Sequence, residues 1–231
     1  MLREALAGRR IAITGGTGFL GTALIERVLR SVPDCDVALL VRPGRRGAEA
    51  RVRREILRNN CFDRLRRQLG ERFDPVVANR IQVLAGDVRN EGLGLDDAGL
   101  AVLEDCDVVV HSAATVSFDS PLDSAVEVNL LGPSRVARTL LDLHADSGKR
   151  PHLIAVSTAY VAGSRRGPAP EATLPETPWA TDVAWRSEVE AARRARADVE
   201  ADSRDPKLLA RFHRMARAEL GAAGTPLLAR G

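Results

Sequence analysis

The chain contains few aromatic residues and few cysteines. Of its 231 residues 3% are aromatic, and only one is a tyrosine, Tyr160. Its three cysteines, Cys35, Cys61 and Cys106, lie far apart, and none belongs to a Cys-x-x-Cys pair. This spacing argues against a disulfide framework and a cysteine-based metal site, and it suits a reducing compartment. We therefore predict no bound metal.

Long apolar runs and a strong charge imbalance are also absent from the sequence. The amino terminus, MLREALAGRR, lacks the apolar run of a signal peptide, and no uninterrupted apolar stretch is long enough to span a bilayer. The net charge of +3 suits a phosphate-bearing ligand but is too small to predict nucleic-acid binding. We expect a cytoplasmic protein with no nucleic-acid partner. Peripheral membrane association stays open, and the oligomeric state is unknown.

Apolar residues nevertheless make up 45% of the chain, which is enough for a buried core. Five short runs rich in Val, Ile and Leu have the continuous apolar character of strands buried on both faces. These runs are 10–15, 36–41, 81–86, 107–113 and 152–157.

Helical patterns separate the predicted strands. One covers 19–32, and another covers 133–144. The first has a stripe of apolar residues four positions apart, formed by Leu20, Leu24, Val28 and Val32. The alternation of strand and helix predicts an α/β fold, a Rossmann-type doubly wound parallel sheet with helices on both faces and helical insertions.

Two charged segments interrupt this alternation. The arginine-rich one has residues at helical spacing, namely Leu57, Cys61, Leu65 and Leu69, so we predict a helical insertion at about 45–80. The second, 182–221, is also helical in pattern and follows a proline-rich connector. We predict a first domain over 1–164, and over 165–231 the connector with its charged helical insertion.

The segment TGGTGFLG, residues 14–21, carries the clearest chemistry. Gly15, Gly18 and Gly21 follow a predicted strand and open a predicted helix. This pattern is typical of dinucleotide binding: the first glycine allows the tight turn, the second lets the backbone approach a diphosphate, and the third lets helix and sheet pack closely. The amino end of the helix adds partial positive charge where the phosphates bind.

The residue after the second strand predicts the form of the dinucleotide. An acidic residue there favours NAD, whereas an arginine accommodates the 2′-phosphate of NADP. The second strand ends in Arg42, so we predict NADP. Arg45 and Arg46 either help to bind this phosphate or are solvated loop residues.

Further candidates lie at the ends of the third and fourth strands. Asp87 either accepts a hydrogen bond from the adenine amino group or caps the following turn. His111 is expected to be packed rather than catalytic, and small residues after it let the backbone lie against the cofactor. The predicted cofactor-binding residues are Gly15, Thr17, Gly18, Phe19, Leu20, Gly21, Arg42, Asp87, Val88, Ala113 and Ala114.

Six segments, taken in order, resemble a known family. They are TGGTGFLG, LLVRPG, GDV, HSAATVSFD, VNLLG and VSTAYVAG, and the match lies between residues 9 and 164. The series resembles the extended short-chain dehydrogenase/reductases, and more specifically their fatty acyl-CoA reductase branch, also called the male-sterility or thioester-reductase type. The helical insertion is typical of that branch.

The resemblance implies a reaction and the residues that carry it. NADPH would reduce a fatty acyl-CoA thioester to an aldehyde and free CoA, and some members reduce the aldehyde further to an alcohol. In the family a Ser/Thr at the fifth strand end and a lysine-activated tyrosine stabilise the developing oxyanion. The match assigns the Ser/Thr role to Thr158, with Ser157 beside it, and a helix-supporting and proton-relay role to Asn129.

The single tyrosine does not complete such a site. Tyr160 lies two residues after Thr158, and position 164 is Ser164, so the sequence contains no Tyr-x-x-x-Lys. The chain is either a fragment that ends before the catalytic helix or a protein that binds the cofactor without catalysis. An extended reductase or epimerase with another substrate is a third alternative. On its own the chain should be nearly inactive, because general acid–base catalysis contributes about a hundred- to ten-thousand-fold.

Overall fold

The computed structural model describes residues 2–117, 120–159, 161, 166–173 and 184–220. Tyr160 lies outside these ranges. The chain divides into two compact units, Met1–Arg165 and Arg166–Gly231, and each is described by itself.

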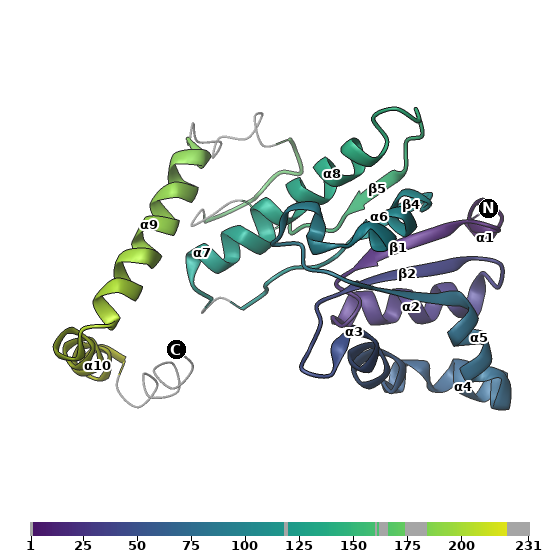
Figure 1. Cartoon of the computed structure of the whole chain (residues 1–231), viewed down its shortest axis with the longest axis horizontal. Helices are drawn as coiled ribbons and strands as arrows, with labels where there is room; N and C mark the ends of the chain where they lie inside the picture. Colours follow the sequence, from purple (N-terminus) through teal and green to yellow (C-terminus); the bar gives the residue numbers. More distant parts are fainter. Residues whose placement is uncertain (1, 118–119, 160, 162–165, 174–183, 221–231) are drawn as a thin grey trace. The chain divides into compact units, whose positions relative to one another are not determined.

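The first unit is built on a sheet of five parallel strands (Figure 1). The strands are β1 (Arg10–Thr14), β2 (Asp36–Val41), β3 (Ile81–Ala85), β4 (Val108–His111) and β5 (His152–Ala155). Their order in the sheet is β3-β2-β1-β4-β5. The chain first adds β2 and β3 on one side of β1 and then crosses over to add β4 and β5 on its other side, so the strand order reverses between β1 and β4. The predicted fold class and all five strands are confirmed. In an open sheet of this kind ligands bind at the carboxyl ends of the strands beside the reversal.

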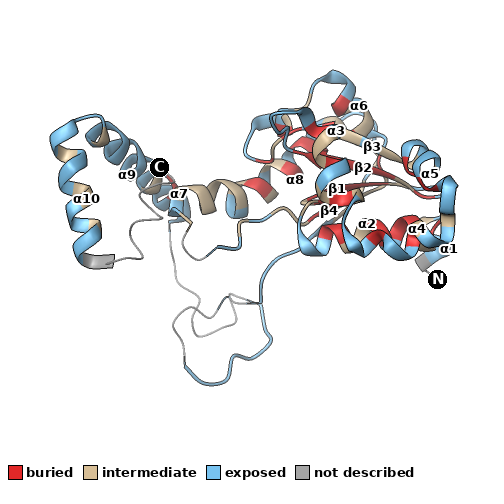
Figure 2. Ribbon diagram, turned by 90° about the horizontal axis from the view of Figure 1, so that it is seen from below, coloured by how far each residue is buried: buried red, intermediate tan, exposed pale blue. Residues whose placement is uncertain are grey.

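Helices cover both faces of the sheet, and the buried residues line its two sides (Figure 2). One face packs against α2 (Phe19–Ser31) and the helices between β2 and β3. The other packs against η4 (Glu91–Gly94), α6 (Asp97–Glu104) and α8 (Leu131–Leu143). The remaining short helices of this unit are α1 (Leu2–Leu6), α7 (Leu122–Ala125) and the π-helix η5 (Val126–Leu130).

The apolar stripe predicted for the first long helix is partly wrong. Val28 and Val32 are buried as expected, but Leu20 is 50% exposed. The buried face of α2 instead begins with Gly21 and Ile25. The first turn of the helix is close to the glycine turn, and only a residue without a side chain fits against it at position 21. This packing shifts the buried face away from Leu20.

The predicted helical insertion is present, but it is not one helix. It consists of α3 (Gly47–Arg51), η1 (a π-helix, Val52–Leu57), η2 (Asn60–Phe62), α4 (Asp63–Leu69), η3 (Gly70–Arg72) and α5 (Phe73–Arg80). The stripe predicted to run through Cys61 is wrong, because that residue is exposed and Phe62 is buried in its place. Asn59 causes the break: its side-chain oxygen accepts a hydrogen bond from the Cys61 nitrogen at 2.9 Å and caps a new helical turn.

The second unit contains two helices, α9 (Trp185–Ser203) and α10 (Pro206–Leu220). We predicted a continuous helical segment, and the break lies at Pro206. Proline has no backbone N–H and favours the first turn of a helix. Asp205 precedes it and accepts a hydrogen bond from the Lys207 nitrogen at 2.7 Å. Across the described ranges, the helices lack the combination of length and apolar character needed to cross a membrane.

Candidate functional site

The glycine turn joins β1 to α2 in a conformation that side chains would prevent. Gly15 has φ +74°, in the left-handed region that favours glycine. A Cβ atom there would lie 2.5 Å from the Ala113 nitrogen, and a Cβ atom on Gly21 would overlap the Gly15 carbonyl oxygen. The Gly18 nitrogen donates to that oxygen at 2.9 Å and closes the turn. The three glycines therefore allow β1, α2 and the loop after β4 to meet.

The amino end of α2 is left without a side-chain cap. Its N-cap residue is Gly18, and no side chain accepts a hydrogen bond from the first turn. The first backbone N–H groups of a helix have no partner within the helix and carry the positive end of its dipole. This end of α2 therefore provides the donors and the field that a diphosphate needs.

A buried hydrogen-bond cluster fixes the ends of β1 and β4. The Thr14 hydroxyl lies 2.7 Å from His111 Nδ1 and accepts the Ala113 N–H at 3.2 Å. The Ser112 hydroxyl donates to the Thr14 carbonyl oxygen at 2.8 Å. Burial lowers the pKa of His111, so the imidazole is neutral. His111 is thus packed beneath the site, as we expected, and its part is structural.

Asn129 fixes the loop that follows β4. Its side-chain oxygen accepts the Thr115 N–H at 2.8 Å, and its amide group donates to the Thr115 carbonyl oxygen at 2.8 Å. Asn129 lies on η5, so this pair of bonds ties the loop to the helical segment that leads into α8. The helix-supporting and proton-relay role that the resemblance implies for Asn129 stays a prediction.

A hollow of about 200 Å³ opens at the carboxyl ends of β1, β2 and β4. It brings together eight of the eleven residues predicted to contact a cofactor. They are Gly15, Thr17, Gly18, Arg42, Asp87, Val88, Ala113 and Ala114.

The other predicted residues lie outside this hollow. Gly21 is buried beneath the glycine turn, whereas Phe19 is 97% exposed and Leu20 is half exposed at the start of α2. Ser157 and Thr158 follow the carboxyl end of β5 and are exposed. They do not line the hollow with the cofactor candidates.

Arg51 is a lining residue that the sequence did not reveal. It comes from α3, nine residues after Arg42, and both line the same hollow. Its Nε donates to Glu55 at 2.8 Å and its Nη1 donates to the Arg42 carbonyl oxygen at 3.3 Å. Glu55 and the backbone of Arg42 therefore hold a second guanidinium beside the first.

Asp87 is held by its neighbour Arg89. One carboxylate oxygen accepts the Arg89 backbone N–H at 3.0 Å, and the guanidinium forms an ion pair with the other at 2.7 Å. Burial raises the pKa of Asp87, but the bonds and charge of Arg89, with the charge of Arg42, outweigh it and keep the pKa below its usual value. Asp87 thus caps the following turn as an ionised carboxylate, and it also lines the hollow.

The strand order, the glycine turn and the uncapped helix end together define a Rossmann-type NAD(P)-binding domain. The model of one protein family, described as male sterility protein, matches residues 13–213. The chain belongs to this family.

Curated relatives carry the names of reductases. Fatty acyl-CoA reductase 2, chloroplastic, from Arabidopsis thaliana is 32% identical over 165 residues, which is 70% of this chain and 26% of that protein. The alcohol-forming fatty acyl-CoA reductase of Simmondsia chinensis is 34% identical over 168 residues, 71% of this chain and 33% of that protein. The chain therefore spans a third or less of the length of these relatives.

A solved structure also matches the chain. It is the reductase domain of a nonribosomal peptide synthetase from Mycobacterium tuberculosis, at 30% sequence identity and a TM-score of 0.48. The match covers 68% of this chain and 34% of that domain.

Proposed function

We propose that the chain is the cofactor-binding part of an NADPH-dependent fatty acyl-CoA reductase. One observation carries the proposal: the residues of the glycine turn and the guanidinium-bearing residues Arg42 and Arg51 line one hollow at the strand ends. NADP requires a site for its diphosphate and a site for its phosphorylated ribose. The amino end of α2 would bind the diphosphate, and the two arginines would bind the ribose phosphate.

The preference for NADP over NAD rests on the two arginines. A guanidinium binds a phosphate through paired hydrogen bonds, and Arg51 is already oriented by Glu55. The end of β2 is followed by Arg42 and not by the acidic residue that would pair with the 2′-hydroxyl of NAD. We therefore infer that the adenosine end of the cofactor is recognised by its 2′-phosphate.

The substrate class is proposed from the family and from the relatives' names, which specify fatty acyl-CoA. Reduced NADP supplies hydride equivalents when bound. Thr158, with Ser157 beside it, would donate a hydrogen bond to the thioester oxygen as negative charge develops there. The Tyr-x-x-x-Lys motif is missing from the sequence, so we expect residues 1–231 to bind the cofactor and to reduce thioester very slowly.

The reaction is tested by expressing the coding sequence in full and measuring NADPH oxidation with a long-chain acyl-CoA. The proposal expects oxidation that depends on the acyl-CoA and releases free CoA together with aldehyde or alcohol. A nucleotide sugar and a steroid serve as alternative substrates. Turnover of either of these without acyl-CoA reduction would contradict the substrate class but not the cofactor site.

A further inference from the structure

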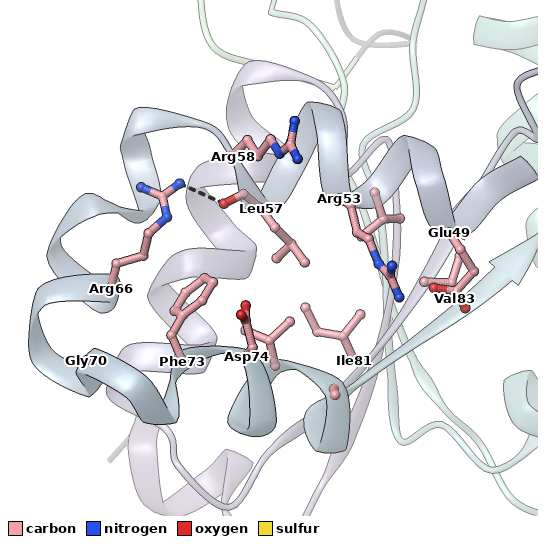
Figure 3. A pocket seen from close by; sticks show the side chains of 13 residues that line it. Glu49, Arg53, Leu57, Arg58, Arg66, Gly70, Phe73, Asp74, Ile81 and Val83 are labelled. Carbon is pink, nitrogen blue, oxygen red and sulfur yellow. Dashed lines mark hydrogen bonds between the residues drawn. The ribbon is translucent and has the colours of Figure 1, made fainter. Parts of the chain in front are cut away.

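The helical insertion and β3 line a second and larger hollow, which is open to solvent. It has a volume of about 780 Å³ and lies between η1, α4, α5 and the strand β3 (Figure 3). β3 is one of the two edge strands of the five-stranded sheet, and within the described residues its pairing partner is β2. The described residues that line this hollow are all different from those that line the dinucleotide hollow. Its size is within the range of about 300–1,000 Å³ that is usual for small-molecule sites.

The floor of the larger hollow is apolar. Side chains from η1, α5 and β3 form it, namely Val52, Leu57, Phe73, Val77, Ile81 and Val83. Leu57 extends into the hollow from η1, and Ile81 faces it from the opposite side (Figure 3). An unbranched hydrocarbon chain matches this floor, because contact with it would remove apolar surface from water.

The rim on the side of α3 and η1 is basic. Its charged lining residues are two arginines, Arg53 and Arg58, and one glutamate, Glu49. A smaller hollow of about 370 Å³ adjoins the larger one there, and the two share Glu49, Arg53 and Arg58. In the part of the chain that the structure describes, neither Arg53 nor Arg58 forms an ion pair, whereas Glu55 is engaged by two other arginines.

The opposite wall is held in place by hydrogen bonds and carries one charge of each sign, Arg66 and Asp74. Arg66 donates to the Leu57 carbonyl oxygen at 2.7 Å, and its guanidinium lies 5.7 Å from the centre of the Phe73 ring (Figure 3). Asp74 projects into the hollow from α5 (Figure 3). Its carboxylate offsets the charge of Arg66 on that side. At the rim two arginines, Arg53 and Arg58, face the single carboxylate of Glu49, so an anionic group is directed to the rim.

We propose that this hollow binds a single-chain amphiphile with an anionic head, of the fatty-acid class. The hydrocarbon chain lies on the apolar floor and the carboxylate pairs with Arg53 and Arg58 at the rim. Arg53 and Leu57 lie on the π-helix η1 and Arg58 is its C-cap residue; π-helical segments are rare and occur frequently at functional sites. This binding does not depend on reductase activity, so either proposal can fail without the other.

The test is calorimetric titration of the full chain with decanoate below its micellar concentration. Decanoate is expected to bind, octanoate to bind roughly tenfold more weakly because two buried methylenes are lost, and acetate not to bind. Nonyltrimethylammonium, which has the same nine-carbon tail and a cationic head, should not bind. Equal binding of decanoate and nonyltrimethylammonium would overturn the proposal.

Matched variants separate the site from general charge effects. Arg53→Ala with Arg58→Ala should weaken decanoate binding by about tenfold or more, because two charge-assisted contacts are lost. Arg64→Ala with Arg67→Ala removes the same charge from exposed positions of α4 and should leave binding unchanged. Ala78→Trp should block the hollow, whereas Gln68→Trp on the exposed side of α4 should not.

NADPH titration and thermal melting of the same variants show whether they are folded. A loss of decanoate binding that is equal in the Arg53/Arg58 and Arg64/Arg67 variants would contradict the site. So would undiminished binding to a folded Ala78→Trp protein.

Discussion

Gly15 and Ala113 are in direct backbone contact, so that a Cβ atom added to Gly15 would lie 2.5 Å from the Ala113 nitrogen. This contact closes the dinucleotide hollow at its base, where β1 and β4 lie side by side. Neither backbone can move away without breaking the hydrogen bond from the Ala113 nitrogen to the Thr14 hydroxyl. The geometry of the site thus depends on the absence of one methyl group.

Gly15→Ala is expected to weaken dinucleotide binding and to lower the free energy of unfolding. Gly8 provides a matched control, because it also has positive φ (+70°) but no atom lies within 4 Å of its virtual Cβ. Gly8→Ala should cost about 1–2 kcal/mol for the left-handed backbone alone. Gly15→Ala should add about 1–3 kcal/mol for the forced contact. Urea unfolding measures the loss of stability in both variants, and NADPH titration measures the loss of binding. Equal effects of Gly15→Ala and Gly8→Ala on binding would contradict the assignment of Gly15 to the dinucleotide site.

The buried histidine predicts a pH dependence of stability. Burial lowers the pKa of His111 from its ordinary value of 6.5. Below about pH 6.5 the unfolded chain takes up a proton at this residue that the folded chain does not. The free energy of unfolding therefore decreases as the pH is lowered, by up to about 1.4 kcal/mol per pH unit, until the folded pKa is reached. His111→Gln should show a smaller slope in urea unfolding between about pH 7.5 and 5.5, above the range of carboxylate titration. An unchanged slope would show that His111 is not the group responsible.

Arg80 joins α5 to the end of α2 and should stabilise the first unit. Its guanidinium donates to the carbonyl oxygens of Leu29, Val32 and Cys35 at 2.5–3.1 Å. Arg80→Ala leaves these acceptors without their partner and should cost about 2–4 kcal/mol. Arg80→Lys should recover only part of this, because an ammonium group cannot span three acceptors in the same way. Arg67→Ala, an exposed change on α4, is the control in urea unfolding.

The three cysteines should differ in reactivity. Burial raises the pKa of Cys35 to about 11 and that of Cys106 to about 12, whereas Cys61 is exposed. Because the thiolate is the reactive form, iodoacetamide should label Cys61 first in the folded protein and the other two only after unfolding. Peptide mass spectrometry gives the order in which the three cysteines are labelled. Early labelling of Cys106 would contradict the packing between β4 and α6.

The sheet could be predicted from the sequence because its strands are continuous apolar runs. The fourth strand ends earlier than predicted, at His111 rather than Ala113, since Ser112 and Ala113 leave the sheet to contact the glycine turn. That early end depends on a contact between segments far apart in the sequence, which local patterns do not contain.

The candidate site could be predicted only where it follows strand ends. Arg42 was found because it comes directly after β2, whereas Arg51 lies on a helix that returns to the same hollow. The break in the insertion at Asn59 was also missed, because the spacing of Leu57, Cys61 and Leu65 fits a helix and the capping bond outweighs it.

The measurement that tests the account most directly is calorimetric titration of the folded chain with NADPH and NADH. The account predicts that NADPH binds more tightly, and that Arg42→Asp weakens NADPH binding far more than NADH binding. Arg51→Ala should act in the same direction, by about tenfold if one charge-assisted phosphate contact is lost. Equal losses for the two cofactors would contradict recognition of the 2′-phosphate by these arginines. Binding of neither cofactor to the folded wild-type chain would contradict the dinucleotide site itself.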